Sequence, residues 1–222
     1  MSHLAERVSP SFNVADEVRA FYERFPYPPP IDDLEKYRRD WQGPQRRRAE
    51  FHLYWPGRAY REDQSILIAG CGTSQAAKHA LRWPAAQVTG IDCSATSVRH
   101  TERLKKKYEM RNLQVHELEI EDVRDLGMSF DQVVCTGVLH HLSDPVRALN
   151  ALRTVLNPGG AMQTDGLCAV REGRDLYAAR VLPTIGYRSK GHRNSGSHRR
   201  TSHVACGTSV AGIAIEGTGL SE

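Results

Sequence analysis

Between residues 65 and 164, short apolar runs alternate with segments in which apolar residues recur every three or four positions. Short runs of this kind are typical of buried strands, and the periodic segments are typical of helices that cover a sheet. Strands separated by helices pair in parallel through right-handed crossovers. The pattern therefore predicts an α/β fold, with a Rossmann-like, doubly wound, mostly parallel sheet. We expect strands over 65–70, 87–92, 113–120 and 130–137, and helices over 75–82, 95–108 and 145–156.

The first 60 residues have a different pattern. Asn13 can cap a helix over 14–25, and the prolines of 26–30 then enforce an extended segment. Two short helices are expected over 32–41 and 44–55. Because these segments have too few apolar positions for a core of their own, we interpret 1–60 as an N-terminal helical cover on a domain formed by 61–164.

Composition narrows the range of partners and compartments. The net charge is +4, but residues 163–222 contain eight Lys/Arg and five Asp/Glu, which leaves only +1 for the first 162 residues. A nucleic-acid partner is therefore unlikely. The five cysteines form no CxxC pair, so neither a metal site nor a disulfide framework is expected. Without a signal-peptide pattern or a long apolar run, we expect no membrane contact and a cytoplasmic protein.

The ends of the predicted strands carry residues suited to binding a nucleoside. Gly70 and Gly72 follow the first strand, where a sharp turn brings the backbone close to a ligand. Gln75 departs from the GxGxxG dinucleotide fingerprint, which disfavours a nicotinamide oxidoreductase. Asp92 ends the second strand, where it can accept hydrogen bonds from a ribose diol, cap the next helix, or do both. The acid pair of residues 121–122 can accept the amino group of adenine or be an exposed connector.

Four segments then resemble the class I S-adenosylmethionine (SAM)-dependent methyltransferases in order and spacing, over about residues 60–162. They are ILIAGCGTSQ, TGIDCSATSV, the acid pair after LEI, and SFDQVVCTGVLHHLSDPVRALNALRTVLNPGG. Ser74 stands where this family has a third motif glycine. The segment FYERFPYPPP also resembles the lead-in of a little-characterised bacterial methyltransferase group.

The resemblance implies SAM as the cofactor and assigns its contacts. The glycine turn would line the methionine part, Asp92 would bind the ribose, Asp122 the adenine amino group, and the end of the fourth strand would face the open side of the cofactor. The full set of expected cofactor-binding residues is Gly70, Cys71, Gly72, Asp92, Cys93, Glu121, Asp122, Thr136 and Gly137.

Catalytic residues are less determined. SAM carries an activated methyl group, so its transfer mainly requires orientation, and a general base is needed only if the acceptor must lose a proton. His140 and His141 follow the fourth strand, where one of them could be that base or both could shape the loop. Tyr22 and Tyr27 lie on the N-terminal cover, where they could close over the cofactor or acceptor or serve packing alone.

The last segment, 165–222, lacks sustained periodicity and is rich in Gly, Ser, Arg and His. It is either a disordered tail or out-of-frame sequence, because a one-base shift in a possible coding sequence after residue 164 yields MVYAPYGRAGIY, which begins like an apolar strand. The resembling family continues with a fifth strand and a hairpin, so we expect the sheet to lack its last strands. The sequence thus predicts a SAM-dependent methyltransferase with an unidentified acceptor. The alternative is a non-catalytic SAM- or nucleoside-binding remnant.

Overall fold

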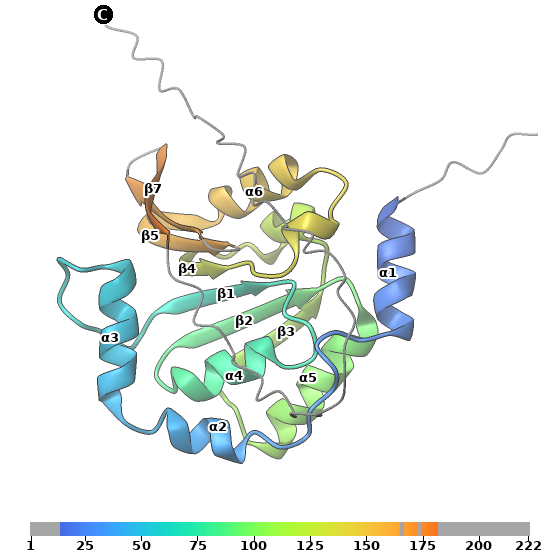
Figure 1. Cartoon of the computed structure of the whole chain (residues 1–222), viewed down its shortest axis with the longest axis horizontal. Coiled ribbons are helices and arrows are strands. Elements are labelled where there is room, and N and C mark those ends of the chain that lie inside the picture. The colour runs from blue at the N-terminus through green and yellow to red at the C-terminus, as the bar shows by residue number, and fades with distance from the viewer. Residues whose placement is uncertain (1–13, 165–166, 173–174, 182–222) are drawn as a thin grey trace, which may run out of the picture. The chain divides into compact units, whose positions relative to one another are not determined.

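The computed structural model describes residues 14–164, 167–172 and 175–181, and its centre is a seven-stranded sheet in the order β3-β2-β1-β4-β5-β6-β7 (Figure 1). The first five strands are parallel. The strands are β1 (Ser65–Ala69), β2 (Gln87–Asp92), β3 (Leu113–Glu117), β4 (Phe130–Val134), β5 (Leu156–Thr164), β6 (Leu167–Glu172) and β7 (Asp175–Val181). The helices are α1 (Val14–Arg24), α2 (Glu35–Asp40), α3 (Pro44–Tyr54), α4 (Gln75–Arg82), α5 (Ala95–Lys107) and α6 (Pro145–Thr154), with 3-10 turns η1 (Ile120–Leu126) and η2 (Leu139–His141).

Helices cover both faces of the sheet, which confirms the doubly wound α/β fold. Alternate side chains of a strand point to opposite faces. Ile66 and Ile68 of β1 accordingly pack in a core with residues of α3, α4 and α5, whereas Leu67 and Ala69 pack in a second core with residues of α6 and η1. Both sets are almost fully buried, as expected for a parallel strand covered on two sides.

The predicted helices and strands match the structure closely, and the differences lie at their ends. β3 ends at Glu117 instead of continuing to residue 120, because the chain turns into η1 at Ile120. α6 begins after Asp144, whose side chain accepts a hydrogen bond from the Arg147 N–H at 2.9 Å. It ends at Thr154, since Leu156 already pairs with β4.

The sheet continues past residue 164, where the sequence had predicted that strands were missing. β6 pairs antiparallel with β5 from Ala161↔Val170 to Thr164↔Leu167, and β7 pairs antiparallel with β6. Segment 165–222 as a whole lacks periodicity, but a strand can be as short as about three residues, and Leu167–Val170 is an apolar run of sufficient length. Residues 182–222 lie outside the described residues, so the hypothesis of a disordered or out-of-frame tail stays a prediction there.

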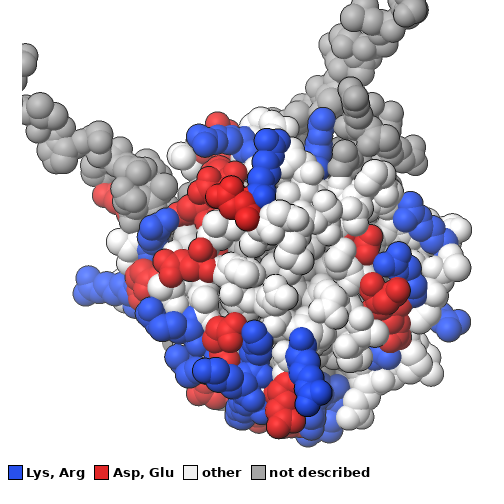
Figure 2. All heavy atoms as spheres, turned by 180° about the vertical axis from the view of Figure 1, so that it is seen from behind, with Lys and Arg blue, Asp and Glu red and all other residues white. Residues whose placement is uncertain are grey.

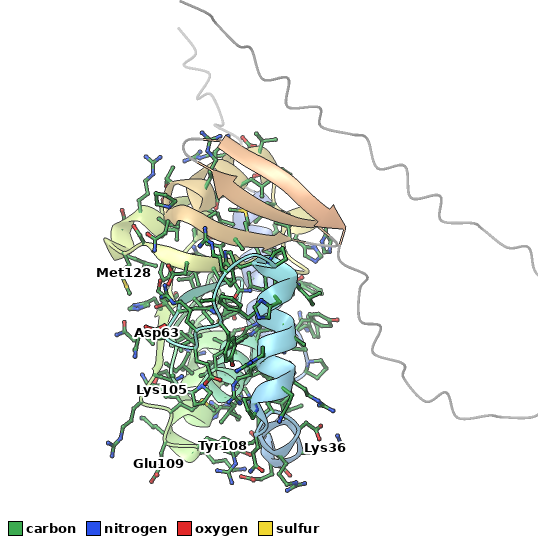
Figure 3. All side chains as sticks on the ribbon, turned by 90° about the vertical axis from the view of Figure 1, so that its left-hand side faces the viewer. Lys36, Asp63, Lys105, Tyr108, Glu109 and Met128 are labelled. Atoms are coloured by element: carbon green, nitrogen blue, oxygen red, sulfur yellow. The ribbon has the colours of Figure 1, made fainter. Side chains whose placement is uncertain are left out.

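The described part of the N-terminal segment shares the core of the sheet domain. Phe51, Tyr54 and Trp55 are buried in the same cluster as Ile66. α3 lies alongside the sheet with α2 at its lower end (Figure 3). The segment between α1 and α2 is fastened to the end of α5, where Tyr108, labelled in Figure 3, accepts a hydrogen bond from the Leu34 N–H at 2.6 Å.

Candidate active site

One cavity lies at the carboxyl ends of the parallel strands, where ligands bind in doubly wound sheets. Each of four neighbouring strands contributes the residues that follow its end. These are Gly70 and Gly72 after β1, Asp92 and Cys93 at β2, Leu118, Glu119 and Ile120 after β3, and Thr136, Gly137 and Val138 after β4.

The glycine turn has the conformation predicted for it. Gly70 and Gly72 have φ angles of +67° and +53°, in the left-handed region that side chains disfavour. A Cβ added at Gly72 would lie 2.5 Å from the carbonyl oxygen of Tyr27, and one added at Gly70 would lie 2.3 Å from a methyl group of Val138. Neighbouring protein atoms therefore leave no room for a side chain at either glycine. Cys71, also expected at the cofactor, is fully buried and does not line the cavity.

Asp92 is held by the backbone on both sides of its strand end. Its Oδ2 accepts a hydrogen bond from the Gly72 N–H at 2.7 Å, and its Oδ1 accepts one from the Ser94 N–H at 2.9 Å. Burial raises the pKa of the Asp92 carboxyl; the two N–H donors oppose the shift and the nearby Glu119 and Glu23 add to it. Ser94 is the residue that caps α5, through a bond from the Ser97 N–H, so Asp92 is left for the cavity.

The acid that reaches the cavity from the third strand is Glu119. Glu121 and Asp122, expected from the sequence to bind adenine, lie in η1 outside the lining. The reason is the early end of β3, which moves the start of the connector to Leu118. Glu119 forms an ion pair with Arg19 of α1. The alternation of Leu118 and Ile120 around this acid is the sequence signal that could have identified it.

Three further expected residues line the cavity: Cys93, Thr136 and Gly137. Burial, with the charges of Asp92 and Glu119, raises the pKa of the Cys93 thiol to about 12, so this cysteine is not a nucleophile at neutral pH. Gly137 has a φ angle of +75°, and no described atom beyond its chain neighbours lies within 4 Å of an added Cβ. Its backbone therefore adjoins open space in the cavity.

Two of the three candidate catalytic residues meet at the cavity. Tyr22 of α1 and His141 of η2 both line it, and their rings meet edge to face at 5.7 Å between centroids. The rings of His140 and His141 are tilted by 45° with centroids 3.8 Å apart, and His140 does not line the cavity. Burial raises the pKa of the Tyr22 hydroxyl, with contributions from Asp92, Cys93 and Tyr27.

The N-terminal segment supplies one wall of the cavity. Val18, Tyr27 and Pro28 line the cavity together with Tyr22. Pro28 is held there by the Thr73 hydroxyl, which donates a hydrogen bond to its carbonyl at 2.7 Å. This contact joins residues 45 positions apart, and only the tertiary structure brings them together.

A family model described as a methyltransferase domain matches residues 67–162, the stretch that builds β1 to β5 and the loops at the cavity. Residues 67–162 are thus a methyltransferase domain by similarity, as the resemblance to the class I SAM-dependent methyltransferases implied. The cofactor of such a domain is SAM, as the resemblance implied. No helix in the described part of the chain is both long and apolar enough to cross a membrane.

Curated relatives of this methyltransferase domain are longer proteins. An uncharacterised protein of Synechococcus sp. is 36% identical over 156 residues, covering 68% of this chain and 36% of that protein. A ubiquinone biosynthesis O-methyltransferase of Albidiferax ferrireducens is 35% identical over 98 residues, covering 44% and 38%. A tRNA U34 carboxymethyltransferase of Campylobacter hominis is 50% identical over 48 residues, covering 22% and 17%. The chain thus spans at most 38% of the length of these relatives.

Proposed function

We propose that this chain binds SAM in the cavity at the carboxyl ends of β1 to β4 and transfers its methyl group to an acceptor. The observation that carries the proposal is the arrangement of Asp92, which is partly buried at the end of β2 and directed by two N–H donors into a cavity that also contains the glycine turn. The names of the relatives point to different acceptors, so the acceptor has to be inferred from the cavity itself.

The lining residues fit the cofactor. Each oxygen of Asp92 has one backbone donor and can accept a further hydrogen bond, as the two hydroxyls of a ribose require. Leu118 and Ile120 offer apolar surface for the adenine ring, and Glu119 between them offers an acceptor for its amino group. The turn at Gly70–Gly72 and the backbone of Gly137 would adjoin the methionine part.

The chain's own residues would orient the acceptor, exclude water and receive a proton. When bound, SAM supplies a methyl group on a sulfonium, which an acceptor lone pair can displace as the C–S bond breaks and its electron pair stays on sulfur. Tyr22 and His141 lie where an acceptor would approach, and a neutral His141 could take the proton that a hydroxyl or ammonium acceptor loses. Val18 and Leu142 add apolar surface that limits access of water.

The test is calorimetric titration of the purified chain with SAM, alongside Asp92→Ala and Asp122→Ala. Loss of the Asp92 carboxylate removes the expected ribose acceptor and leaves the buried N–H of Gly72 without its partner. We expect SAM affinity to fall by at least about 30-fold, equivalent to roughly 2 kcal/mol. Asp122→Ala, in an acid outside the cavity, should bind within twofold of wild type.

Asp92→Asn and circular dichroism serve as the folding control for this titration. A folded wild-type chain that does not bind SAM, or an Asp92→Ala variant that binds as wild type does, would contradict the proposal. The alternative of a non-catalytic remnant gains no support from the structure, in which β5 is followed by two more paired strands. Tyr22 and His141 also line the cavity, which supports the proposal of a catalytic domain.

A further inference from the structure

A row of aromatic rings leads from the surface of α1 to the cavity. The ring centroids of Phe25 and Phe21 are 5.3 Å apart, those of Phe21 and Tyr22 are 5.5 Å apart, and those of Tyr22 and His141 are 5.7 Å apart. The last two residues line the cavity, and the first two lie outside it. The row is therefore continuous with the proposed active site.

The outer part of this row is exposed to an unusual degree for aromatic side chains. Phe21 and Phe25 are 57% and 52% exposed, and Tyr27, which also lines the cavity, is 66% exposed. Aromatic side chains gain much from burial, and adjacent exposed ones mark binding surfaces. Phe21 lies in α1 and Phe25 directly follows its last residue, four positions further on, so the two rings present one surface.

Hydrogen bonds made by polar side chains hold this segment in place without using the rings. The Thr73 hydroxyl donates to the carbonyl of Pro28, and Glu23 accepts two hydrogen bonds from the N–H and the hydroxyl of Thr96, at 3.1 and 2.5 Å. The rings of Phe21 and Phe25 therefore remain available, while the backbone that carries them is fixed beside the glycine turn and the start of α5.

We propose that this row, defined as Phe25, Phe21, Tyr22 and His141 with Tyr27 beside it, binds the acceptor, and that the acceptor has a flat aromatic body. The inference rests on the proposed function. Ring faces and edges favour a planar aromatic partner over a saturated one of equal size, because aromatic pairs gain from stacked and edge-to-face contact beyond the area they bury. The hydroxyls of Tyr22 and Tyr27 supply polar contacts to the group that receives the methyl.

The charges on the molecule are consistent with a neutral aromatic acceptor. On the face shown in Figure 2, basic and acidic side chains of the described residues are interleaved instead of gathered into one basic field. At the row itself, the Arg24 guanidinium lies 5.3 Å from the centroid of the Phe25 ring, and Glu23 is engaged with Thr96. The recognition surface is thus aromatic in character, with charges at its rim.

The experiment uses 2-naphthol as the aromatic probe and trans-2-decalol as a saturated probe of the same size. Both are titrated into the full chain saturated with S-adenosylhomocysteine, which fills the cofactor site without turnover. We expect 2-naphthol to bind at least tenfold more tightly than trans-2-decalol. The double variant Phe21→Ser/Phe25→Ser should weaken 2-naphthol binding about tenfold while SAM affinity stays within twofold. Both residues are exposed, so the variant should fold.

Leu53→Ser is the matched control, because Leu53 is a 41% exposed apolar residue on α3, outside the cavity. It should leave 2-naphthol binding unchanged. Equal affinity for the two probes would contradict the proposal that the acceptor is aromatic. Equal 2-naphthol affinity in wild type and the double variant would contradict the proposal that Phe21 and Phe25 bind it. A wild-type chain that binds SAM but no 2-naphthol at millimolar concentration overturns this inference alone. A chain that fails to bind SAM overturns the proposed function as well.

Discussion

The two walls of the cavity are built in different ways. On the sheet side, Gly72 and Asp92 belong to turns at the ends of neighbouring parallel strands and are joined backbone to side chain at 2.7 Å. On the N-terminal side, Tyr22 and Tyr27 project from a segment that touches the first wall through a few side-chain contacts, such as Thr73 to Pro28. In the function proposed above, the sheet wall holds the cofactor and the N-terminal wall faces the methyl acceptor.

Other parts of the N-terminal cover are anchored to the sheet domain at a distance from the cavity. Arg82, at the end of α4, pairs with Glu50 of α3 at 2.5 Å, and its guanidinium lies 4.2 Å from the centroid of the Trp41 ring. Trp55 donates a hydrogen bond from its indole N–H to the carbonyl of Gly159 at 2.9 Å. These contacts hold the cover on the domain at a distance from α1, the helix that is proposed to contact the acceptor.

The largest effect should come from breaking that anchor. Glu50→Ala leaves the mostly buried Arg82 without its carboxylate, and removing one partner of such a pair typically costs about 3 kcal/mol. We expect a loss of that size in the free energy of unfolding, measured by urea denaturation. Lys36→Ala, which removes an exposed ion pair with Asp40, should cost less than about 0.5 kcal/mol. Equal effects of the two variants would show that the anchor lies elsewhere.

A second variant tests how closely the two walls meet. Gly72→Ala forces a side chain into the left-handed region and against the carbonyl of Tyr27, so we expect a destabilisation of roughly 3 kcal/mol. Gly127→Ala has a similar φ of +62°, but no described atom beyond its neighbours lies within 4 Å, so the backbone cost of about 1 kcal/mol should stand alone. The difference between the two in urea denaturation measures the contact of the walls. Equal destabilisation by the two variants would show that the N-terminal segment does not contact the glycine turn as closely as described.

This division also explains which parts were predictable from the sequence. Gly70, Gly72 and Asp92 were found because a strand, a turn and the residue at the strand end are local features with their own composition. Glu119 was missed because the predicted third strand was extended to residue 120, whereas β3 ends at Glu117. Pro28 could not be assigned to the cavity, because its partner Thr73 lies 45 residues away and no local pattern records that contact.

The role of Glu119 can be tested against the position that the family resemblance indicated. Glu119→Gln keeps the shape of the side chain but loses the charge that strengthens a hydrogen bond from an adenine amino group. We expect SAM affinity to fall about tenfold, or 1.4 kcal/mol, by calorimetry. Asp122→Asn should bind within twofold of wild type, since its side chain lies outside the cavity. If Asp122→Asn weakened SAM binding and Glu119→Gln did not, Asp122 and not Glu119 would contact the adenine.

The smallest effect concerns pH, and it separates the demands of the cofactor from those of the fold. Burial raises the pKa of Asp92 above its ordinary value, so the carboxylate takes up a proton earlier than usual on acidification. SAM affinity should then fall a few-fold between neutral pH and the ordinary aspartate range near pH 4, because a protonated carboxyl has lost acceptor capacity.

The contribution of Asp92 to the stability of the fold has the opposite dependence on pH. A raised pKa in the folded chain means that stability is gained as the pH falls through that pKa, and the gain is complete below the unfolded value. Calorimetry and urea denaturation of wild type and Asp92→Asn across this range isolate both contributions. If acid strengthened SAM binding in wild type relative to the variant, the carboxylate of Asp92 would not be the ribose acceptor.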